Sequence, residues 1–516
     1  MVAAMNSILP GSPSISTPDA LIRALVTLPA HISDVTAGSR NAKRGAMFLA
    51  YPGATRDGRD FIADAIARGA SAVLYEANDF VWHADWKVPH IAVDNLKAHA
   101  SLIAGHVYQH PSDALWMVGV TGTNGKTSVS QWVAQALELA GRRSAVLGTI
   151  GNGLIGRLVA SDNTTLDAVA LQRSLREYVS IGANTCAMEV SSHGLDQGRV
   201  ADIKYDVAVF TNLTRDHLDY HGTMEAYGNA KAKLFAAHGL KAAVINVDDH
   251  FGRALADRVE NRGVAVTRFA CNGGSKLANL LATDLSVTAG GLSFTVRCAR
   301  GVSGEARVES PILGAFNVSN LLAVVAVLRA SGIPLDKAAT IAGQLSPVPG
   351  RMQTVDAGDG RGAASNKPLV IIDYAHTPDA LEKALSTIAA IVPDRGRLIS
   401  VFGCGGDRDR GKRPQMGAIS AKYADMTFVT SDNPRTEKAR QVIADIEPGL
   451  SGSAYRVVED RHQAIYEALD EARANDIVVI AGKGHEDYQI IGETRHHFSD
   501  VEVAREALTA WRGRAS

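Results

Sequence analysis

The sequence predicts an α/β protein of three domains, in which mostly parallel sheets are covered by helices. Apolar runs typical of buried strands alternate with helical stretches through most of the chain, which is the pattern of strand–helix–strand units. The length of 516 residues exceeds what one hydrophobic core commonly supports. Breaks in the pattern at His110–Asp113 and Pro347–Gly350 divide the chain into blocks 1–112, 113–346 and 347–516.

Each block is expected to contain its own strands and helices. The first holds a helix at 61–68 and a strand at 72–75. The second opens with a strand at 115–120, a glycine-rich turn and a helix at 127–140, and it has a hairpin around Gly290-Gly291. Further apolar runs predict strands at 144–147, 185–190, 207–210 and 242–245 and a helix at 317–330 in the second block, and strands at 369–372, 398–402, 426–430 and 477–480 in the third.

Composition excludes several partners. The number of Lys and Arg residues (53) nearly equals the number of Asp and Glu residues (54), whereas proteins that bind nucleic acid or anionic membranes usually carry an excess of basic residues. The four cysteines are far apart without CxxC spacing, which argues against disulfide or structural zinc frameworks and fits a reducing compartment. No apolar run reaches the length of a membrane span and no secretory signal is apparent. We therefore expect a cytoplasmic protein with small-molecule partners, no nucleic acid and no membrane insertion.

Polar segments directly follow the four strands expected in the third block. Because ligands of open parallel sheets sit outside the carboxyl ends of the strands, we expect these segments to meet at one edge. Polar loops follow strands in many proteins, but this set is rich in Asp, Arg, His and Glu. The four segments are Asp373–His376, Gly403–Arg413, Asp432–Arg435 and Gly482–Asp487.

A glycine-rich loop, Thr121–Thr127 (TGTNGKT), lies between a predicted strand and a predicted helix. The backbone N–H groups of such a loop and of the helix N-terminus bind phosphate oxygens, the lysine reaches the β and γ phosphates, and the threonine hydroxyl binds Mg²⁺. The general pattern GxxxxGK[ST] requires glycine where this chain has Val120. We interpret the loop as a nucleotide site; the alternative is a glycine-containing turn that binds no ligand. A hydrolase, kinase, switch or ligase could each use it.

Glu189 ends one predicted strand and His217 follows another, so both are expected at the same sheet edge as Lys126. Glu189 and Thr127 are natural ligands of Mg²⁺, which prefers oxygen. His217 follows another strand, and by itself it fits a structural role as well as a metal contact. Lys231 by itself fits a solvated helical lysine.

The chain resembles the Mur ligase family, most closely its diaminopimelate-adding members. The resemblance extends over essentially the whole chain, and the family's form of the phosphate loop accounts for Val120. The segments that carry it are GTNGKT at 122–127, EVSS at 189–192, NLTRDHLD at 212–219, GAFNVSN at 314–320 and DYAHTP at 373–378.

The resemblance implies a smaller N-terminal UDP-binding α/β domain, a central P-loop ATPase domain with a mostly parallel sheet, and a C-terminal Rossmann-like domain. It implies that ATP phosphorylates the D-Glu γ-carboxylate of UDP-N-acetylmuramoyl-L-alanyl-D-glutamate, and that the amine of meso-diaminopimelate attacks the acyl phosphate. Lys231 aligns with a lysine that the family carbamylates with CO₂ to serve a second Mg²⁺, which requires a neutral, shielded amine. Domain closure around ATP and a monomeric chain are expected.

The resemblance also assigns residues. Lys126, Lys231, His217 and Glu189 are expected to be catalytic, and Thr127, Glu189, His217 and carbamylated Lys231 to bind metal. The residues expected to bind the nucleotide are Thr121, Gly122, Thr123, Asn124, Gly125, Lys126, Thr127, Ser128, Asn320, Arg351 and Asp373. The UDP-sugar dipeptide is assigned to Ser39, Asn163, Thr164, Thr165, Ser191, Gln197 and Arg199, together with the loop 53–59, where Ala54 and Thr55 depart from the family's usual residues.

The tetrapeptide Asp432–Arg435 (DNPR) is expected to select the amino acid. Diaminopimelate carries a second carboxylate where lysine has none, and a guanidinium recognises a carboxylate bidentately. Chemistry alone leaves open that DNPR is only a capped turn. The substrate residues assigned to diaminopimelate are Arg408, Asp432, Asn433, Pro434, Arg435, Gly482 and Glu486, with Glu486 for the distal ammonium. Lysine-adding ligases and folylpolyglutamate synthetases are the nearest alternatives, and a regulatory ATP-binding protein is an alternative of another class.

Overall fold

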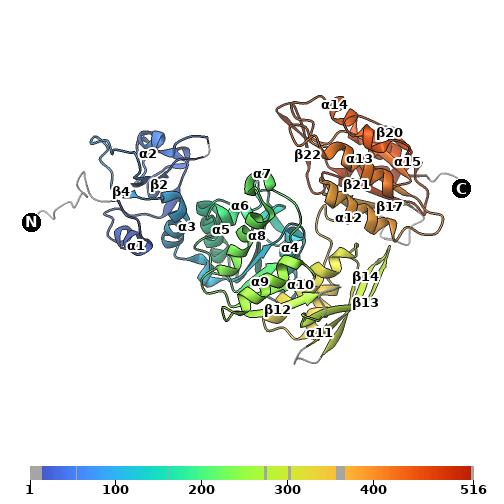
Figure 1. Cartoon of the computed structure of the whole chain (residues 1–516). Helices are drawn as coiled ribbons and strands as arrows, with labels where there is room; N and C mark the ends of the chain where they lie inside the picture. The colour runs from blue at the N-terminus through green and yellow to red at the C-terminus, as the bar shows by residue number, and fades with distance from the viewer. Residues whose placement is uncertain are drawn as a thin grey trace, which may run out of the picture. The chain divides into compact units, whose positions relative to one another are not determined.

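A computed structural model describes residues 14–53, 55–161, 163–271, 276–299, 304–355 and 367–512 (Figure 1). The chain forms two compact units, Met1–Ala278 with Ala326–Ser331 and Asn279–Val325 with Gly332–Ser516. Ala54 lies outside the described residues. So does all but Lys367 of the segment Gly358–Lys367, whose glycine-rich, polar sequence predicts a surface loop.

The first unit begins with a four-stranded parallel sheet, ordered β1-β2-β3-β4. Alternating side chains of these strands enter two apolar cores, one against α1 and α3 and the other against α2. The helix expected at 61–68 is confirmed as the shorter α2, preceded by the 3₁₀ turn η2. The bounds are α1 Pro18–Val26, β1 Asp34–Thr36, η1 Ser39–Asn41, β2 Ala46–Ala50, η2 Gly58–Phe61, α2 Ile62–Ala67, β3 Ala72–Glu76, β4 His90–Val93, α3 Leu96–Val107 and η3 Pro111–Ala114.

The larger sheet of this unit has the order β12-β11-β10-β5-β9-β6-β7-β8, and its strands from β12 to β6 are parallel. Since β5, β9 and β10 are neighbours, the loops after Thr121, Glu189 and Phe210 leave the same edge. The bounds are β5 Trp116–Thr121, α4 Lys126–Leu139, β6 Ser144–Gly148, β7 Gly151–Leu154, β8 Arg157–Val159, α5 Ala168–Ser180, β9 Thr185–Glu189, α6 Ser192–Asp196, β10 Val207–Phe210, α7 Leu218–His221, α8 Met224–Ala232, η4 Lys233–Ala236, β11 Ala242–Asn246, α9 His250–Glu260 and β12 Ala265–Ala270.

The second unit begins with three antiparallel strands. The predicted hairpin at Gly290-Gly291 is confirmed, because β13 and β14 pair around it. Gly291 has φ +137°, and a Cβ there would lie 2.1 Å from the Ser310 carbonyl oxygen, so this position requires glycine. The bounds are β13 Leu280–Thr288, β14 Gly291–Cys298, β15 Glu305–Ser310, α10 Phe316–Ala330 and α11 Leu335–Gly343.

A six-stranded sheet, β16-β17-β21-β18-β19-β20, follows and is parallel except for β16 (Figure 1). One face packs on α12, α13 and α14, and the other on α15 and α16, which makes this part doubly wound as expected. The bounds are β16 Gln353–Val355, β17 Leu369–Asp373, α12 Pro378–Ala389, β18 Leu398–Phe402, α13 Lys412–Tyr423, β19 Met426–Val429, α14 Ala439–Ala444, η6 Glu447–Leu450, β20 Tyr455–Val457, α15 Arg461–Glu471, β21 Ile477–Ala481, β22 Tyr488–Ile491, β23 Thr494–His497 and α16 Asp500–Ala510.

A fully buried ion pair joins α15 to α16. Arg461 Nε and Nη2 each donate to the Asp500 carboxylate at 2.7 Å, and Nη2 also donates to the carbonyl oxygen of Ala481 at the end of β21. Removing one partner of such a pair lowers the free energy of unfolding strongly, because it leaves the other charge buried without an opposite charge. The pair therefore fixes the end of β21, from which the segment 482–487 departs.

We expect Asp500→Asn to lower the free energy of unfolding of the full chain by about 3–5 kcal/mol, measured by urea denaturation. Asp379→Asn is the matched control, because it removes an exposed pair with Lys383 and should cost less than about 1 kcal/mol. Equal stability of the two variants would contradict the prediction.

Candidate functional site

The glycine-rich loop is held rigidly against the segment that follows β10. A Cβ on Gly122 (φ +148°) would lie 1.9 Å from Thr211 Oγ1, so only glycine fits this close approach. Asn212 accepts two hydrogen bonds from the loop: its carbonyl oxygen from Thr123 N at 2.8 Å and its Oδ1 from Asn124 N at 3.0 Å. The loop therefore leads into the N-terminus of α4 with a fixed backbone, as a phosphate site requires.

Glu189 lies at the centre of a buried cluster of donors. Its Oε2 accepts hydrogen bonds from the hydroxyls of Thr127 at 2.9 Å and Thr149 at 3.2 Å, and its Oε1 accepts one from Thr149 N at 2.8 Å. A Cβ on Gly148 would lie 2.2 Å from Oε1, so the missing side chain makes room for the carboxylate. A hydroxyl and a carboxylate side by side suit Mg²⁺, which keeps several waters.

Two lysines converge on the carbonyls of the loop. Lys126 Nζ donates to Gly122 O at 3.0 Å and to Thr123 O at 2.8 Å. Lys231 Nζ donates to the same Gly122 oxygen at 2.7 Å and lies 4.2 Å from the Tyr227 ring centroid. Lys231 is 1% exposed, so its interpretation from the residue alone as a solvated lysine is wrong. Burial, assisted by the charge of Lys126, lowers the pKa of Lys231 well below its ordinary value.

His217 lies in an aromatic cluster beside the loop. Its ring centroid is 4.9 Å from that of His193 and 6.1 Å from that of Tyr227, whose hydroxyl hydrogen-bonds Thr123 Oγ1 at 3.3 Å. Burial lowers the pKa of His217, and the neighbouring Asp216 opposes the shift. Across the described parts of the chain, no three His, Cys, Asp or Glu side chains are grouped to hold a metal.

Most residues assigned to the UDP-sugar dipeptide form one hydrogen-bonded chain next to Glu189. Thr165 Oγ1 donates to Glu189 O at 2.9 Å and accepts from Ser191 N at 3.0 Å. Arg199 donates to Thr165 O at 2.8 Å and to Gln197 Oε1 at 2.6 Å. The remaining assigned residues are Thr164, which bonds Thr149 at 3.0 Å, the exposed Asn163, and Ser39 in η1 beside the first sheet.

In the second unit, Asp373 lies at the end of β17 beside Arg351. Asp373 Oδ2 accepts a hydrogen bond from Met352 N at 2.8 Å, and burial raises the pKa of Asp373 against the opposing charge of Arg351. The Arg351 guanidinium lies 4.5 Å from the Tyr374 ring centroid. Asn320 donates to Asn317 Oδ1 at 2.8 Å on α10.

The four polar segments of the third block do meet at one edge, as predicted. Gly482 N donates to Asp373 O at 3.1 Å, and Gly406 N donates to Asn433 O at 2.9 Å. Arg435 (φ +53°) donates from Nη1 to Gly406 O at 2.8 Å. Arg408 is exposed in the same segment as Gly406.

Sequence reasoning missed a buried lysine at this edge. Lys483 Nζ lies 3.1 Å from Asn433 Oδ1, 3.4 Å from Asp432 Oδ1 and 3.6 Å from Glu486 Oε2. Burial raises the pKa of Glu486, and Lys483 opposes that shift. The available signal was a lysine between two glycines directly after an apolar strand. Thr149 and Tyr227 were also missed, because nothing local marks them.

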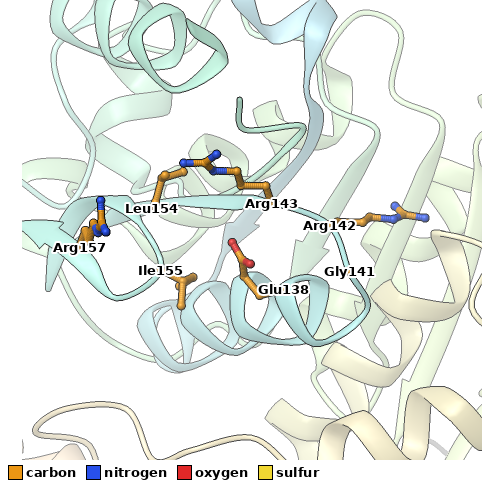
Figure 2. A pocket seen from close by; sticks show the side chains of 7 residues that line it. All are labelled: Glu138, Gly141, Arg142, Arg143, Leu154, Ile155 and Arg157. Carbon is orange, nitrogen blue, oxygen red and sulfur yellow. The ribbon is translucent and has the colours of Figure 1, made fainter. Parts of the chain in front are cut away.

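One pocket of about 440 Å³ lies at the opposite end of α4 from the phosphate loop. Figure 2 shows that Arg142 points away from Arg143 and Arg157, so the three cations do not converge. None of the residues assigned above lines it. The lining residues are Glu138, Gly141, Arg142, Arg143, Leu154, Ile155 and Arg157.

A rigid phosphate loop, an oxygen-rich acidic centre and a charged edge on a doubly wound sheet define the class as a nucleotide-using α/β enzyme. Comparison with known families is consistent with this class. Residues 120–328 match the Mur ligase middle domain, 350–484 match the Mur ligase glutamate ligase domain, and 31–108 match the Mur ligase family catalytic domain. The chain belongs to the Mur ligase family of ATP-dependent ligases.

Several relatives carry the name UDP-N-acetylmuramoyl-L-alanyl-D-glutamate–2,6-diaminopimelate ligase. The protein of Chromobacterium violaceum is 50% identical over 481 residues, covering 93% of this chain and 95% of its own. That of Pseudomonas aeruginosa is 48% identical over 481 residues, covering 93% and 96%. A solved structure of that name has a TM-score of 0.68 at 37% identity, covering 93% and 95%. The MurF ligase of Thermotoga maritima in complex with ADP, at 18% identity, covers 92% and 97% with a TM-score of 0.62 and shares the fold.

No helix in the described ranges is both long and apolar enough to span a membrane.

Proposed function

We propose that this protein uses ATP to join meso-2,6-diaminopimelate to the D-Glu γ-carboxylate of UDP-N-acetylmuramoyl-L-alanyl-D-glutamate in peptidoglycan precursor synthesis. The observation that carries the proposal is the edge where Arg435, Asn433 and Glu486 lie together, since a guanidinium and a carboxylate complement a second amino-acid head. The names of relatives at 45–50% identity support the same substrate. Asp432, Pro434, Gly482 and Arg408 complete the proposed amino-acid site.

The chain's own residues account for the activation step. The γ-carboxylate attacks the γ phosphorus of ATP and ADP leaves. The amine of diaminopimelate then attacks the acyl carbon, and phosphate leaves as the amide forms. We assign the β and γ phosphates to Lys126 and the loop amides, and the dipeptide to the hydrogen-bonded chain from Thr165 to Arg199. Asn320, Arg351 and Asp373 are retained as nucleotide contacts on the resemblance alone.

The donor set around Glu189 fits Mg²⁺, because the Thr127 hydroxyl and the carboxylate are adjacent oxygen ligands. We propose that Thr127 and Glu189 hold one ion, and that His217 and Lys231 serve a second. When bound, such ions neutralise the phosphate charge that develops during transfer.

We further propose that Lys231 is carbamylated. Its amine is buried and its pKa is lowered, which favours the neutral nitrogen that attacks CO₂ to form a carbamate and release one proton. We expect Lys231→Met to lower kcat at least a hundredfold. The carbamate itself is expected as a ¹³C resonance in wild-type protein equilibrated with ¹³C-bicarbonate, and it should vanish in Lys231→Met. Lys233→Met, which removes an exposed lysine two residues away, is the control.

The proposed compartment is the cytoplasm, because the four cysteines lie far apart in the sequence without CxxC spacing, a pattern that fits a reducing compartment. We propose the domain boundaries 1–112, 113–346 and 347–516 and a monomeric chain.

Competition between substrates tests the function directly. Purified protein receives ATP, the UDP-sugar dipeptide and equal amounts of diaminopimelate and lysine, and products are resolved by mass spectrometry. We expect diaminopimelate product in large excess. Predominant lysine product, or no UDP-linked product, would reject the proposal.

A further inference from the structure

Lys483 has an environment that is hard to explain by packing alone. Its side chain is fully buried at the end of β21, yet it carries an ammonium that must be compensated. The compensation comes from three side chains on two segments: Asn433 at 3.1 Å, Asp432 at 3.4 Å and Glu486 at 3.6 Å. All three belong to the proposed amino-acid site.

The charges around Lys483 do not balance to zero. One lysine faces two carboxylates, while the nearby Arg461 is already neutralised by Asp500. The cluster is therefore one negative charge in excess, which complements the distal ammonium of a diamino acid.

Lys483 also links the two residues that would orient that ammonium. Asn433 Nδ2 donates to Glu486 Oε2 at 3.0 Å, while Asn433 Oδ1 accepts from Lys483 Nζ and from Ile490 N at 2.9 Å. This arrangement fixes which end of the Asn433 amide faces Glu486. Both Lys483 and Asn433 approach the same carboxylate oxygen, so Oε1 is the oxygen that we assign to the ligand.

We infer that Lys483 is a positioning residue for amino-acid selection: it fixes the orientation of the Asn433 amide and places its cation beside Glu486, the carboxylate that receives the distal ammonium of the substrate. The inference rests on the proposed function. We assign Lys483 no contact with the substrate or the reacting atoms, because its side chain is fully buried among protein partners, and it acts through Glu486 and Asn433. A lysine of purely structural importance would affect stability without affecting the choice or ionisation of the substrate.

The first test is steady-state kinetics of Lys483→Met in the full chain. We expect KM for diaminopimelate to rise at least tenfold, with KM for ATP and for the UDP-sugar dipeptide within about twofold of wild type. Lys422→Met is the matched control, because Lys422 is exposed and pairs only peripherally with Glu382. Should Lys483→Met fail to fold, Lys483→Gln, which can still donate to Asn433, replaces it in the same test.

The second test is the pH profile of kcat/KM for diaminopimelate. Removing the cation raises the pKa of Glu486, so the acidic limb is expected to move to higher pH in Lys483→Met and to be absent in Glu486→Gln. The other titratable or charged groups facing Glu486 are Asp432, Arg461, Tyr374 and Tyr488, and they are unchanged in both variants.

A double-mutant cycle separates positioning from general damage. On the Glu486→Gln background, Lys483→Met should change KM for diaminopimelate by no more than about threefold, because the carboxylate that Lys483 faces, and toward which it orients the Asn433 amide, is gone. A full tenfold effect on that background, or an unchanged KM and pH profile in Lys483→Met alone, overturns the inference. A wild-type protein that forms no diaminopimelate product rejects the proposed function and this inference together.

Discussion

Replacing Lys126 by methionine is expected to lower kcat for ligation by about a thousandfold. The Lys126 ammonium donates hydrogen bonds to the carbonyl oxygens of Gly122 and Thr123 in the phosphate loop. In the proposed complex, this is where the γ phosphate of ATP develops charge during transfer. Methionine keeps the length and the apolar stem of the side chain but has no charge to offer. The loop backbone is fixed by Asn212, so we expect the fold to survive.

Phosphate release dependent on diaminopimelate measures this effect, and circular dichroism and thermal unfolding check the fold. Lys241→Met is the control, since that lysine is mostly exposed and pairs with Asp206. A Lys126→Met protein that ligates within tenfold of wild type would refute the assignment of the loop to the transferred phosphate.

Replacing Arg435 by lysine is expected to raise KM for diaminopimelate about a hundredfold while KM for ATP stays within about twofold. The guanidinium already uses Nη1 to hold Gly406 O and has further N–H groups for a carboxylate. An ammonium cannot make that planar two-point contact, so the far carboxylate of the substrate loses a partner.

Isothermal titration and initial-rate kinetics with diaminopimelate and ATP test this prediction. Arg440→Lys, at an exposed position on α14, provides the matched control. If Arg435→Lys kept the wild-type KM, the far carboxylate would have to be bound elsewhere, and DNPR would be only a turn.

The parallel sheets were predictable because most of their strands are predominantly apolar runs. The strands at 207–210 and 398–402 match β10 and β18 at both ends, and the hairpin at Gly290-Gly291 is where it was expected. Such strands need no information beyond the run itself, because both faces are buried. The helix at 61–68 was less well defined, since its first turn is the 3₁₀ turn η2.

The arrangement of the site was predictable where its residues lie in one contiguous motif or directly after a predicted strand. The loop 121–127 is such a motif, and its Thr127 lies beside Glu189 at the sheet edge where both were expected. The burial of Lys231 and Lys483 was not predictable from composition, because each depends on segments 109 and about 50 positions away along the chain. These two lysines are buried because of contacts with distant parts of the chain, which the residue type alone does not reveal.

The DNPR loop is not a free-standing element. The Arg435 backbone donates to Ile490 O at 3.1 Å and accepts from Gly492 N at 2.8 Å, so this residue forms an isolated parallel bridge with Ile491 at the end of β22. Gln489 adds a bond to Asp432 O at 2.7 Å. Transplanting the tetrapeptide alone into a ligase with another amino-acid preference would therefore transfer the four residues without the hairpin that fixes their backbone. To exchange substrate preference between such enzymes, the segment Asp432–Arg435 and the β22–β23 hairpin have to be transferred together.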